Sequence, residues 1–195
     1  MTLDLLLSIL VQGVMTGLVY GLMALGLSVI FGVVRVVNFA HGEFAVVAMY
    51  AAWLLFNTWG VDPILAALPI AGALFVVGFV LQRTVINPFV GRPEHEQFIL
   101  LVSVAMIVLN LLLMGFGADP KPVNLSYGLD SYEVGPVIVD KVRLIVSAAS
   151  LGLTAVVLCF FRFTRTGTAI RACADNLLGA AVVGLDVKHL YAVTF

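Results

Sequence analysis

The sequence predicts an all-α integral membrane protein, a polytopic helical bundle. Of its 195 residues, 62% are hydrophobic and only 11% are charged, whereas soluble domains average about 25% charged residues. Runs of 18 residues or more without Asp, Glu, Lys or Arg recur along the chain, and about 20 helical residues cross a bilayer core. The formal net charge of −1 argues against nucleic-acid binding, which calls for a clustered basic surface.

Five uncharged runs predict membrane-spanning helices. They are 5–34, 44–61, 63–82, 97–118 and 144–161. A further run opens at Leu190, and the chain stops inside it at Phe195. We therefore expect a C-terminally truncated chain, in which residues 1–195 form a single, incomplete transmembrane domain.

The placement of Lys and Arg predicts the orientation of these spans. Cytoplasmic loops of membrane proteins carry an excess of both residues. If the spans alternate, seven of the ten lie in the segments 35–43, 83–96 and 162–189. This bias predicts an external N-terminus, a cytoplasmic 162–189 and an external loop 119–143. Pro, Gly and the β-prone run 137–139 in that loop indicate a turn-rich, solvated connector with a hairpin.

Two stripes of residues at four-residue spacing lie on the first span. One is a doubled G-x-x-x-G pattern, which lets another helix approach closely. The other is polar and would be unsatisfied against lipid. The stripes are Gly13, Gly17 and Gly21, and Gln12, Thr16 and Tyr20. Both should face protein or a wet pathway, so helix packing is one interpretation and the lining of a solute path is the other.

The stretch "VVNFAHGEFAVV" places Asn38, His41 and Glu43 within six residues of an otherwise apolar region. The preceding 30 uncharged residues would span roughly 45 Å as a helix, well beyond a core of about 30 Å. Either that helix is strongly tilted, or the chain breaks near Gly26 or Gly32. The second case predicts a broken or re-entrant helix near 35–45.

Two interpretations of this polar stretch remain open. It is either a wetted loop at the cytoplasmic face or an intramembrane functional site, since ionisable residues within a membrane mark such sites by default. Asn38 is a suitable N-cap for a helix beginning at Phe39, and the positive end of such a half-helix can face an anionic solute group. We expect no metal site, because no second cluster completes the four ligands of structural zinc.

The segment 162–189 contains a third informative feature. Residues 168–183 predict a short helix with Arg171 and Asp175 four apart, and Gly184 is a plausible stop. An apolar side of this helix would lie on lipid or dock in a partner's groove. Without further context, a helix that lies flat at the membrane interface is the simpler interpretation. The apolar residues are Leu177, Leu178, Ala181 and Val182.

Two separated stretches resemble one family. "GLVYGLMALGLSVIFGVVRVVNFAHGEF" (17–44), above all "NFAHGE", and "TRTGTAIRACADNLLGAAVVGLDVKHLYAVTF" (164–195) are similar to the permease subunits of branched-chain amino acid ABC importers. The resemblance covers the whole chain in order of elements, and 1–195 would be an incomplete permease domain. In "AAVVG", two residues separate alanine from glycine where the general importer loop has three.

The resemblance implies roles for particular residues. Asn38, His41, Gly42 and Glu43 would form the central broken-helix region of the translocation path. The segment 162–189 would couple the permease to an ATPase groove, through Arg171, Ala172, Asp175, Ala180 and Gly184. The implied partners are a sister permease, two cytoplasmic ATP-binding subunits and an external solute-binding protein, in a bacterial plasma (inner) membrane.

The predicted function is therefore that of a pore subunit for branched-chain amino acids, working by alternating access. Relatives with the same motif import urea or short amides, so those solutes stay open. The chain lacks a G-x-x-x-x-G-K-[ST] segment, and we expect no catalytic residue, no cofactor of its own and ATP bound by partner subunits. The alternatives are a secondary transporter or channel, and a membrane enzyme using His41 and Glu43 as an acid–base pair near Ser103 and Asn110.

Overall fold

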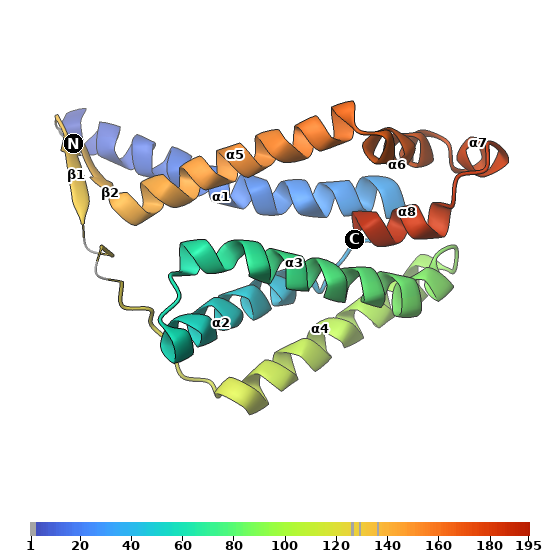
Figure 1. Ribbon diagram of the computed structural model, residues 1–195, viewed down its shortest axis with the longest axis horizontal. Coiled ribbons are helices and arrows are strands. Elements are labelled where there is room, and N and C mark those ends of the chain that lie inside the picture. The colour runs from blue at the N-terminus through green and yellow to red at the C-terminus, as the bar shows by residue number, and fades with distance from the viewer. Residues whose placement is uncertain (1–2, 126, 129, 136) are drawn as a thin grey trace. The chain divides into compact units, whose positions relative to one another are not determined.

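A computed structural model describes residues 3–125, 127–128, 130–135 and 137–195 (Figure 1). Its elements in chain order are α1 (Leu3–Val34), α2 (His41–Trp59), α3 (Pro63–Leu81), the π-helix η1 (Gln82–Ile86), the 3₁₀ helix η2 (Asn87–Phe89), α4 (Glu94–Phe116), β1 (Ser131–Val134), β2 (Val137–Asp140), α5 (Lys141–Phe163), α6 (Arg165–Asp175), α7 (Leu177–Val182) and α8 (Val187–Thr194). The chain divides into two compact units, and the expected single transmembrane domain stays a prediction. Unit 1 comprises Met1–Ser28 and Asn124–Gly167, and unit 2 comprises Val29–Val123 and Thr168–Phe195.

The helices confirm an all-α polytopic membrane protein. Within the described residues, four stretches are long and apolar enough to cross a bilayer: Leu5–Val34, Pro63–Phe89, Glu94–Phe116 and Lys141–Phe163. The helix α2, with 19 residues, is not among the four. Its two ends are polar, with His41 and Glu43 at one and Asn57 and Thr58 at the other. The span expected at 44–61 therefore stays a prediction.

Helices α2, α4 and α5 begin three residues before the uncharged runs that predicted them. A first helical turn accepts charged and polar side chains, because its backbone N–H groups are free and its end of the helix dipole is positive. Glu94 and Glu96 occupy that turn in α4. In α5, the carboxylate of Asp140 accepts hydrogen bonds from the backbone N–H groups of Val142 and Arg143. The uncharged runs therefore miss the first turn of each of these helices.

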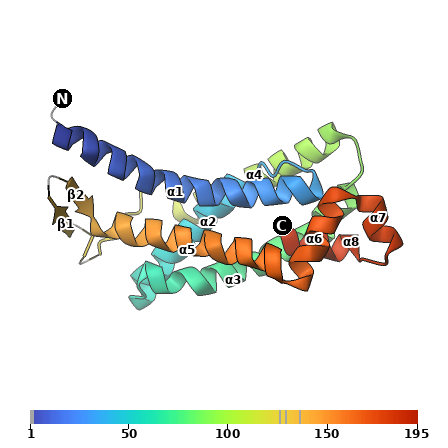
Figure 2. The ribbon, with the colours of Figure 1, turned by 90° about the horizontal axis from the view of Figure 1, so that it is seen from above.

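Unit 1 consists of the first part of α1, the two-stranded hairpin and α5. The helices α1 and α5 run in the same direction from the hairpin end (Figure 2). Strands β1 and β2 pair antiparallel, with Ser131 opposite Asp140, and Gly135 takes the positive φ of 62° beside their turn. The hairpin expected in 119–143 is therefore present, although Ser126, Leu129 and Pro136 of that loop lie outside the described residues.

Unit 2 packs α2 against α3 and α4, and α8 against the end of α3 and η1. Its buried side chains include Ile70, Ile86 and Leu101. The ring centroids of Phe39 and Phe98 lie 4.8 Å apart in an edge-to-face contact, which joins the segment before α2 to the first turns of α4. Aromatic contacts of this kind contribute about 0.5–1.5 kcal/mol beyond their buried area.

The cytoplasmic helix expected at 168–183 is wrong as a single element, because α6 and α7 meet at Asn176. The Asn176 side chain accepts a hydrogen bond from the backbone N–H of Gly179 at 2.8 Å, and this cap starts a new helix where the sequence pattern predicts continuation. The expected stop at Gly184 is confirmed, since Gly184 has a φ of +86° and Leu185 N–H donates to the Ala180 carbonyl.

Candidate functional site: the helix break at residues 35–40

The chain leaves helical geometry at Arg35 and resumes it at His41. The helix α1 runs unbroken through Gly26 and Gly32 to Val34, and Arg35 takes a φ of 57°. The break predicted near 35–45 is therefore confirmed, whereas its predicted origin at Gly26 or Gly32 is wrong. A helix satisfies all of its backbone groups internally, which lipid requires, so glycine alone does not end it.

Asn38 organises the non-helical segment. Its side chain is 4% exposed, and its Oδ1 accepts a hydrogen bond from the backbone N–H of Ala40 at 3.0 Å. Its carbonyl accepts the N–H of His41 at 3.2 Å. The helix α2 begins at His41, with Ala40 at the N-cap position and no side-chain cap. The expected cap on a helix starting at Phe39 is thus wrong by two residues, because Asn38 instead closes a side-chain turn ahead of the helix.

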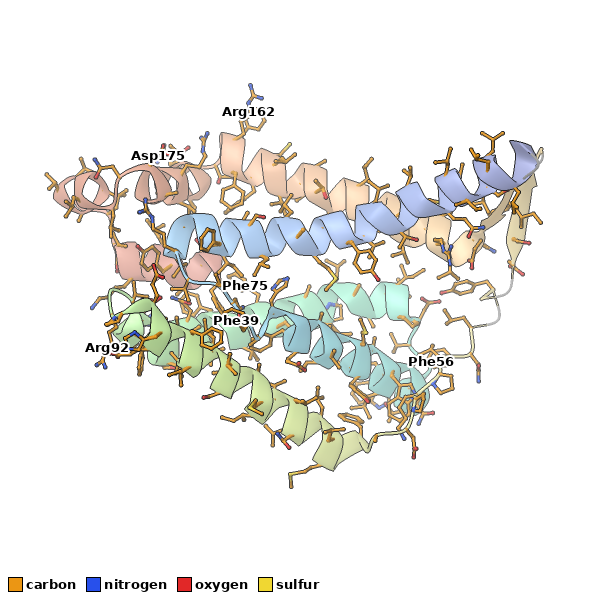
Figure 3. The ribbon with its side chains drawn as sticks, turned by 180° about the vertical axis from the view of Figure 1, so that it is seen from behind. Phe39, Phe56, Phe75, Arg92, Arg162 and Asp175 are labelled. Atoms are coloured by element: carbon orange, nitrogen blue, oxygen red, sulfur yellow. The ribbon has the colours of Figure 1, made fainter. Side chains whose placement is uncertain are left out.

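A pocket of about 210 Å³ lies beside this turn. Asn38 and His41 contribute its polar side chains, and α3 supplies residues between 71 and 78. Its full lining is Asn38, His41, Phe44, Ala71, Leu74, Phe75, Gly78 and Phe195. Residues 71–78 lie near the middle of the candidate span Pro63–Phe89, and Figure 3 shows Phe39 and Phe75 near the break. The polar turn therefore faces the middle of a span rather than its end, which favours an intramembrane site over a wetted loop.

The pocket includes only part of the predicted polar cluster. His41 is half-buried and lines it, whereas Gly42 and Glu43 do not. On a helix with 100° per residue, Phe44 shares the face of His41 and Glu43 points about 200° away. The side chains of His41 and Glu43 form no hydrogen bond or ion pair with another described residue. This divergence gives the alternative of an acid–base pair no geometric support.

The polar stripe on α1 lies in unit 1. The Gln12 side-chain oxygen accepts a hydrogen bond from Arg143 Nη1 at 3.0 Å, and the Thr16 hydroxyl donates to the Gln12 carbonyl at 2.9 Å. Tyr20 is 67% exposed. The Arg143 partner has no sequence signal, because 131 residues separate it from Gln12. Both the solute-path and the packing interpretations of this stripe stay predictions.

The glycine stripe lies open in the described structure. A Cβ added at Gly13, Gly17 or Gly21 would meet no described atom within 4 Å. The close helix contact predicted for these glycines therefore has no partner among the described residues of unit 1. The open face remains available to a helix of another chain.

The predicted coupling residues fall into two groups, one on α6 and one on and after α7. Arg171, Ala172 and Asp175 are exposed on α6 and, with Thr168 and Ala174, line a shallow hollow of about 300 Å³. The Arg171 guanidinium donates to the Thr168 hydroxyl at 3.5 Å, and no ion pair joins Arg171 to Asp175 in this part of the described chain.

The second group lies on and after α7. Ala180 is buried and Gly184 forms the turn that ends the helix. Leu178 and Val182 project from α7, 79% and 86% exposed. The apolar side expected for this helix is therefore uncovered by the described residues. On α6, Cys173 is buried, and this burial raises the pKa of its thiol.

Arg35 is the residue that the sequence reasoning missed, because it entered only as a charge that orients the spans. Its guanidinium Nη2 donates to the carbonyl of Ala174 in the last turn of α6, at 3.5 Å. A cation is favourable at this end of a helix, where the carbonyl groups are free and the dipole is negative. The start of the break is thus joined directly to the predicted coupling segment. The available signal was the position of Arg35 immediately before the motif.

Comparison with known proteins gives a consistent set of relatives. Residues 9–195 match the family described as "Branched-chain amino acid transport system / permease component". The "High-affinity branched-chain amino acid transport system permease protein BraD" of Pseudomonas aeruginosa is 24% identical, over 95% of this chain and 64% of the relative. The corresponding LivH protein of Salmonella typhimurium is 24% identical, over 94% and 64%.

A "Probable branched-chain amino acid transport permease protein LivH" of Methanocaldococcus jannaschii is 29% identical, over 86% of this chain and 54% of the relative. This chain thus spans less than two thirds of the length of these curated relatives. No solved structure matches it significantly.

Proposed function

The chain belongs to the family of permease components of branched-chain amino acid transport systems, and from this premise we propose that it is the pore subunit of an ATP-driven importer. It is a multi-pass protein of the bacterial inner membrane. The proposed solute is a branched-chain amino acid, with urea and short amides as related candidates. The family match over residues 9–195 carries the proposal.

The proposed assembly contains a sister permease, two cytoplasmic ATP-binding subunits and an external solute-binding protein. We assign ATP binding to separate subunits, and residues 1–195 contain no phosphate-binding G-x-x-x-x-G-K-[ST] segment. The binding protein supplies affinity, so the path needs only a weak site that is exposed alternately to each side. Such alternating access is a population shift between two conformations.

The pocket beside the helix break has the chemistry that such a path requires. Its lining from Phe44, Leu74 and Phe75 suits a branched aliphatic side chain. Asn38 and His41 supply polar groups in place of the water that a zwitterion sheds, and the positive N-terminal end of α2 favours the solute carboxylate. We assign Gly42 and Glu43 to the same region of the path, on the other side of α2.

The contact between Arg35 and Ala174 supports a route for coupling. Movement of α6 by a bound ATPase would displace the carbonyl that holds the Arg35 guanidinium. Arg35 begins the segment that ends at the pocket-lining residues Asn38 and His41. A rigid-body shift of α6 would in this way be transmitted to the solute site along residues 35–40. We propose the exposed residues Arg171, Ala172 and Asp175 as part of the surface that meets the ATPase.

The first test is a pull-down of the full-length protein from membranes in mild detergent, followed by mass spectrometry. We expect an ATPase and a second permease to copurify with it. Recovery of the protein alone, under detergent that keeps known ABC importers intact, would contradict the proposed assembly and favour a secondary transporter or channel.

A second test measures uptake of labelled leucine by cells that depend on the full-length protein. We expect His41→Ala and Glu43→Gln to lower the uptake rate while the complex still assembles. The first removes a polar group from the path, and the second removes a charge from it. Ser103→Ala is the matched control, since the Ser103 hydroxyl only donates to the Ile99 carbonyl of its own helix. Normal uptake by both path variants would exclude the assigned role.

A further inference from the structure

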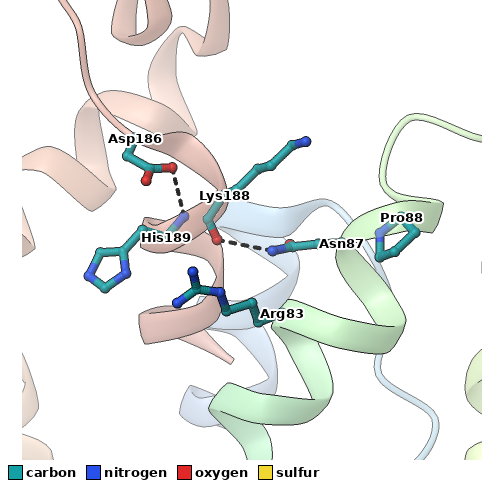
Figure 4. Close-up of a pocket in the computed structure, with 6 residues that line it drawn as sticks. All are labelled: Arg83, Asn87, Pro88, Asp186, Lys188 and His189. Atoms are coloured by element: carbon teal, nitrogen blue, oxygen red, sulfur yellow. Dashed lines mark hydrogen bonds between the residues drawn. The ribbon is translucent and has the colours of Figure 1, made fainter.

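A second, larger pocket of about 440 Å³ lies in unit 2 at the end of the candidate span Pro63–Phe89. It shares no lining residue with the pocket beside the helix break. Arg83, Asn87 and Pro88 line it from η1 and η2, and Asp186, Lys188 and His189 line it from the N-terminal end of α8 (Figure 4). The proposed transport function uses none of these side chains.

The pocket carries an excess of positive charge. Arg83 and Lys188 have no carboxylate within ion-pair distance among the described residues. The one acidic lining residue, Asp186, caps α8, where its Oδ1 accepts the backbone N–H of His189 at 3.1 Å. In Figure 4 the Arg83 guanidinium lies near the His189 side of the pocket, and the Lys188 side chain extends away from the Arg83 guanidinium.

The walls of the pocket are joined by one exposed and one partly buried hydrogen bond. Asn87 Nδ2 donates to the carbonyl of Lys188 at 3.1 Å and so joins η2 to α8. Asn87 Oδ1 accepts a hydrogen bond at 3.0 Å from Nε2 of Gln82, a residue with 0% exposure. The ring centroids of Phe79 and His189 lie 5.8 Å apart. The relative positions of Arg83 and α8 are therefore set by packed structure and not by a loose loop.

An exposed apolar stripe on α3 leads to Arg83. Its members follow one another at three- or four-residue spacing and so share one helix face with Arg83. They are Leu65 (73% exposed), Leu68 (83%), Gly72, Val76 (59%) and Val80 (51%). A face that is apolar over the length of a span and ends in an unpaired cation matches a phospholipid, which has acyl chains below a phosphate.

We infer that this pocket binds the phosphate headgroup of an anionic phospholipid, whose acyl chains lie along the stripe. A guanidinium binds phosphate oxygens in a bidentate geometry, and Lys188 adds a second cation to the pocket lining, on a flexible four-carbon stem. Basic pockets between helices on the cytoplasmic side of a membrane recognise such headgroups, and the distribution of Lys and Arg assigns this end of the span to the cytoplasm. A free phosphate ion would use the polar half of the site alone.

The test uses the purified full-length protein in detergent and compares three probes. These are dioleoyl phosphatidylglycerol, dioleoyl phosphatidylcholine with the same acyl chains, and inorganic phosphate. Bound lipid is counted by native mass spectrometry, and protection is measured as the shift in thermal unfolding midpoint. We expect phosphatidylglycerol to bind more tightly than phosphatidylcholine. Equal binding of both lipids, or equal protection by millimolar inorganic phosphate, would overturn the inference.

Substitutions locate the bound headgroup. We expect Arg83→Gln and Lys188→Gln each to weaken phosphatidylglycerol binding about fivefold, the effect of one cation near a membrane surface. Arg83→Lys should retain most of the preference. Arg162→Gln is the matched control, because Arg162 is an exposed cation at the same predicted face, outside the pocket. The unfolding midpoints of both glutamine variants without lipid show whether they fold like the parent protein. If both fold and bind phosphatidylglycerol as tightly as the parent protein does, the headgroup does not bind at this site.

Discussion

Replacing Asn38 with alanine removes the acceptor used by a buried backbone N–H group. The donor is Ala40, which has 0% exposure, and the Asn38 side chain is 4% exposed. The donor–acceptor distance of 3.0 Å is that of a good hydrogen bond. A buried donor left without a partner costs about 1–3 kcal/mol. Asn38→Ala should therefore lower the folding equilibrium constant about 5- to 150-fold.

The assay is reversible unfolding of the full-length protein in mixed micelles, followed by circular dichroism. Asn110→Ala is the matched control, because Asn110 is exposed on α4 and its amide donates only to the Met106 carbonyl of the same helix. Removing the Asn110 amide leaves no buried backbone donor without a partner, so this control does not incur the cost expected for Asn38→Ala. If Asn38→Ala changes the free energy of unfolding as little as this control, the turn at residues 38–41 does not depend on the Asn38 side chain.

Two further predictions concern the segment that follows α5. Gly167→Ala should destabilise the protein by on the order of 3 kcal/mol, because a Cβ there collides with the Phe160 carbonyl oxygen and the Phe161 backbone. Gly152→Ala is the control and should be neutral or stabilising, because its Cβ meets no described atom within 4 Å. Equal unfolding midpoints for the two variants would contradict the clash. Burial raises the pKa of the Cys173 thiol in the folded protein. The buried neutral thiol therefore contributes its full stability below the ordinary thiol pKa of about 8.5. This contribution is lost as the pH rises through the raised pKa, because the unfolded state ionises first. Unfolding free energies measured from about pH 7.5 to 10 should fall more steeply for the parent protein than for Cys173→Ala, and parallel curves would contradict this assignment.

The long helices were predictable because their signal is local. An uncharged run of about 20 residues satisfies its own backbone only as a helix in lipid, and α1, α3, α4 and α5 follow that rule. The local signal was weaker where a side chain competes with the helix. Asn176 divides the predicted helix at 168–183 by capping Gly179, since Asn hydrogen-bonds nearby backbone groups as readily as it continues a helix.

The candidate site was predictable in part. The motif around Asn38 identifies a break in the helix, and the structure has that break at residues 35–40. The position of Arg35 before the motif singled out that residue, but no sequence signal identified its partner Ala174 or the pocket partners Leu74 and Phe75. These partners lie about 30 to 140 positions away. The separation of Glu43 from His41 follows only once the first residue of α2 is known, since each residue of helix rotates the side chain by about 100°.

The sequence by itself determined that this chain is a polytopic helical membrane protein, and it located a polar interruption at residues 36–43. Both follow from composition and from the demand that backbone groups be satisfied within lipid. Only the tertiary structure decided that the Asn38 turn faces the middle of the candidate span Pro63–Phe89 rather than its end. It also decided that Arg35 meets α6 and that Arg83 lines a pocket with the N-terminal end of α8. These relations depend on how separate helices pack, and packing is a sum of many weak contacts between distant residues that no local pattern encodes.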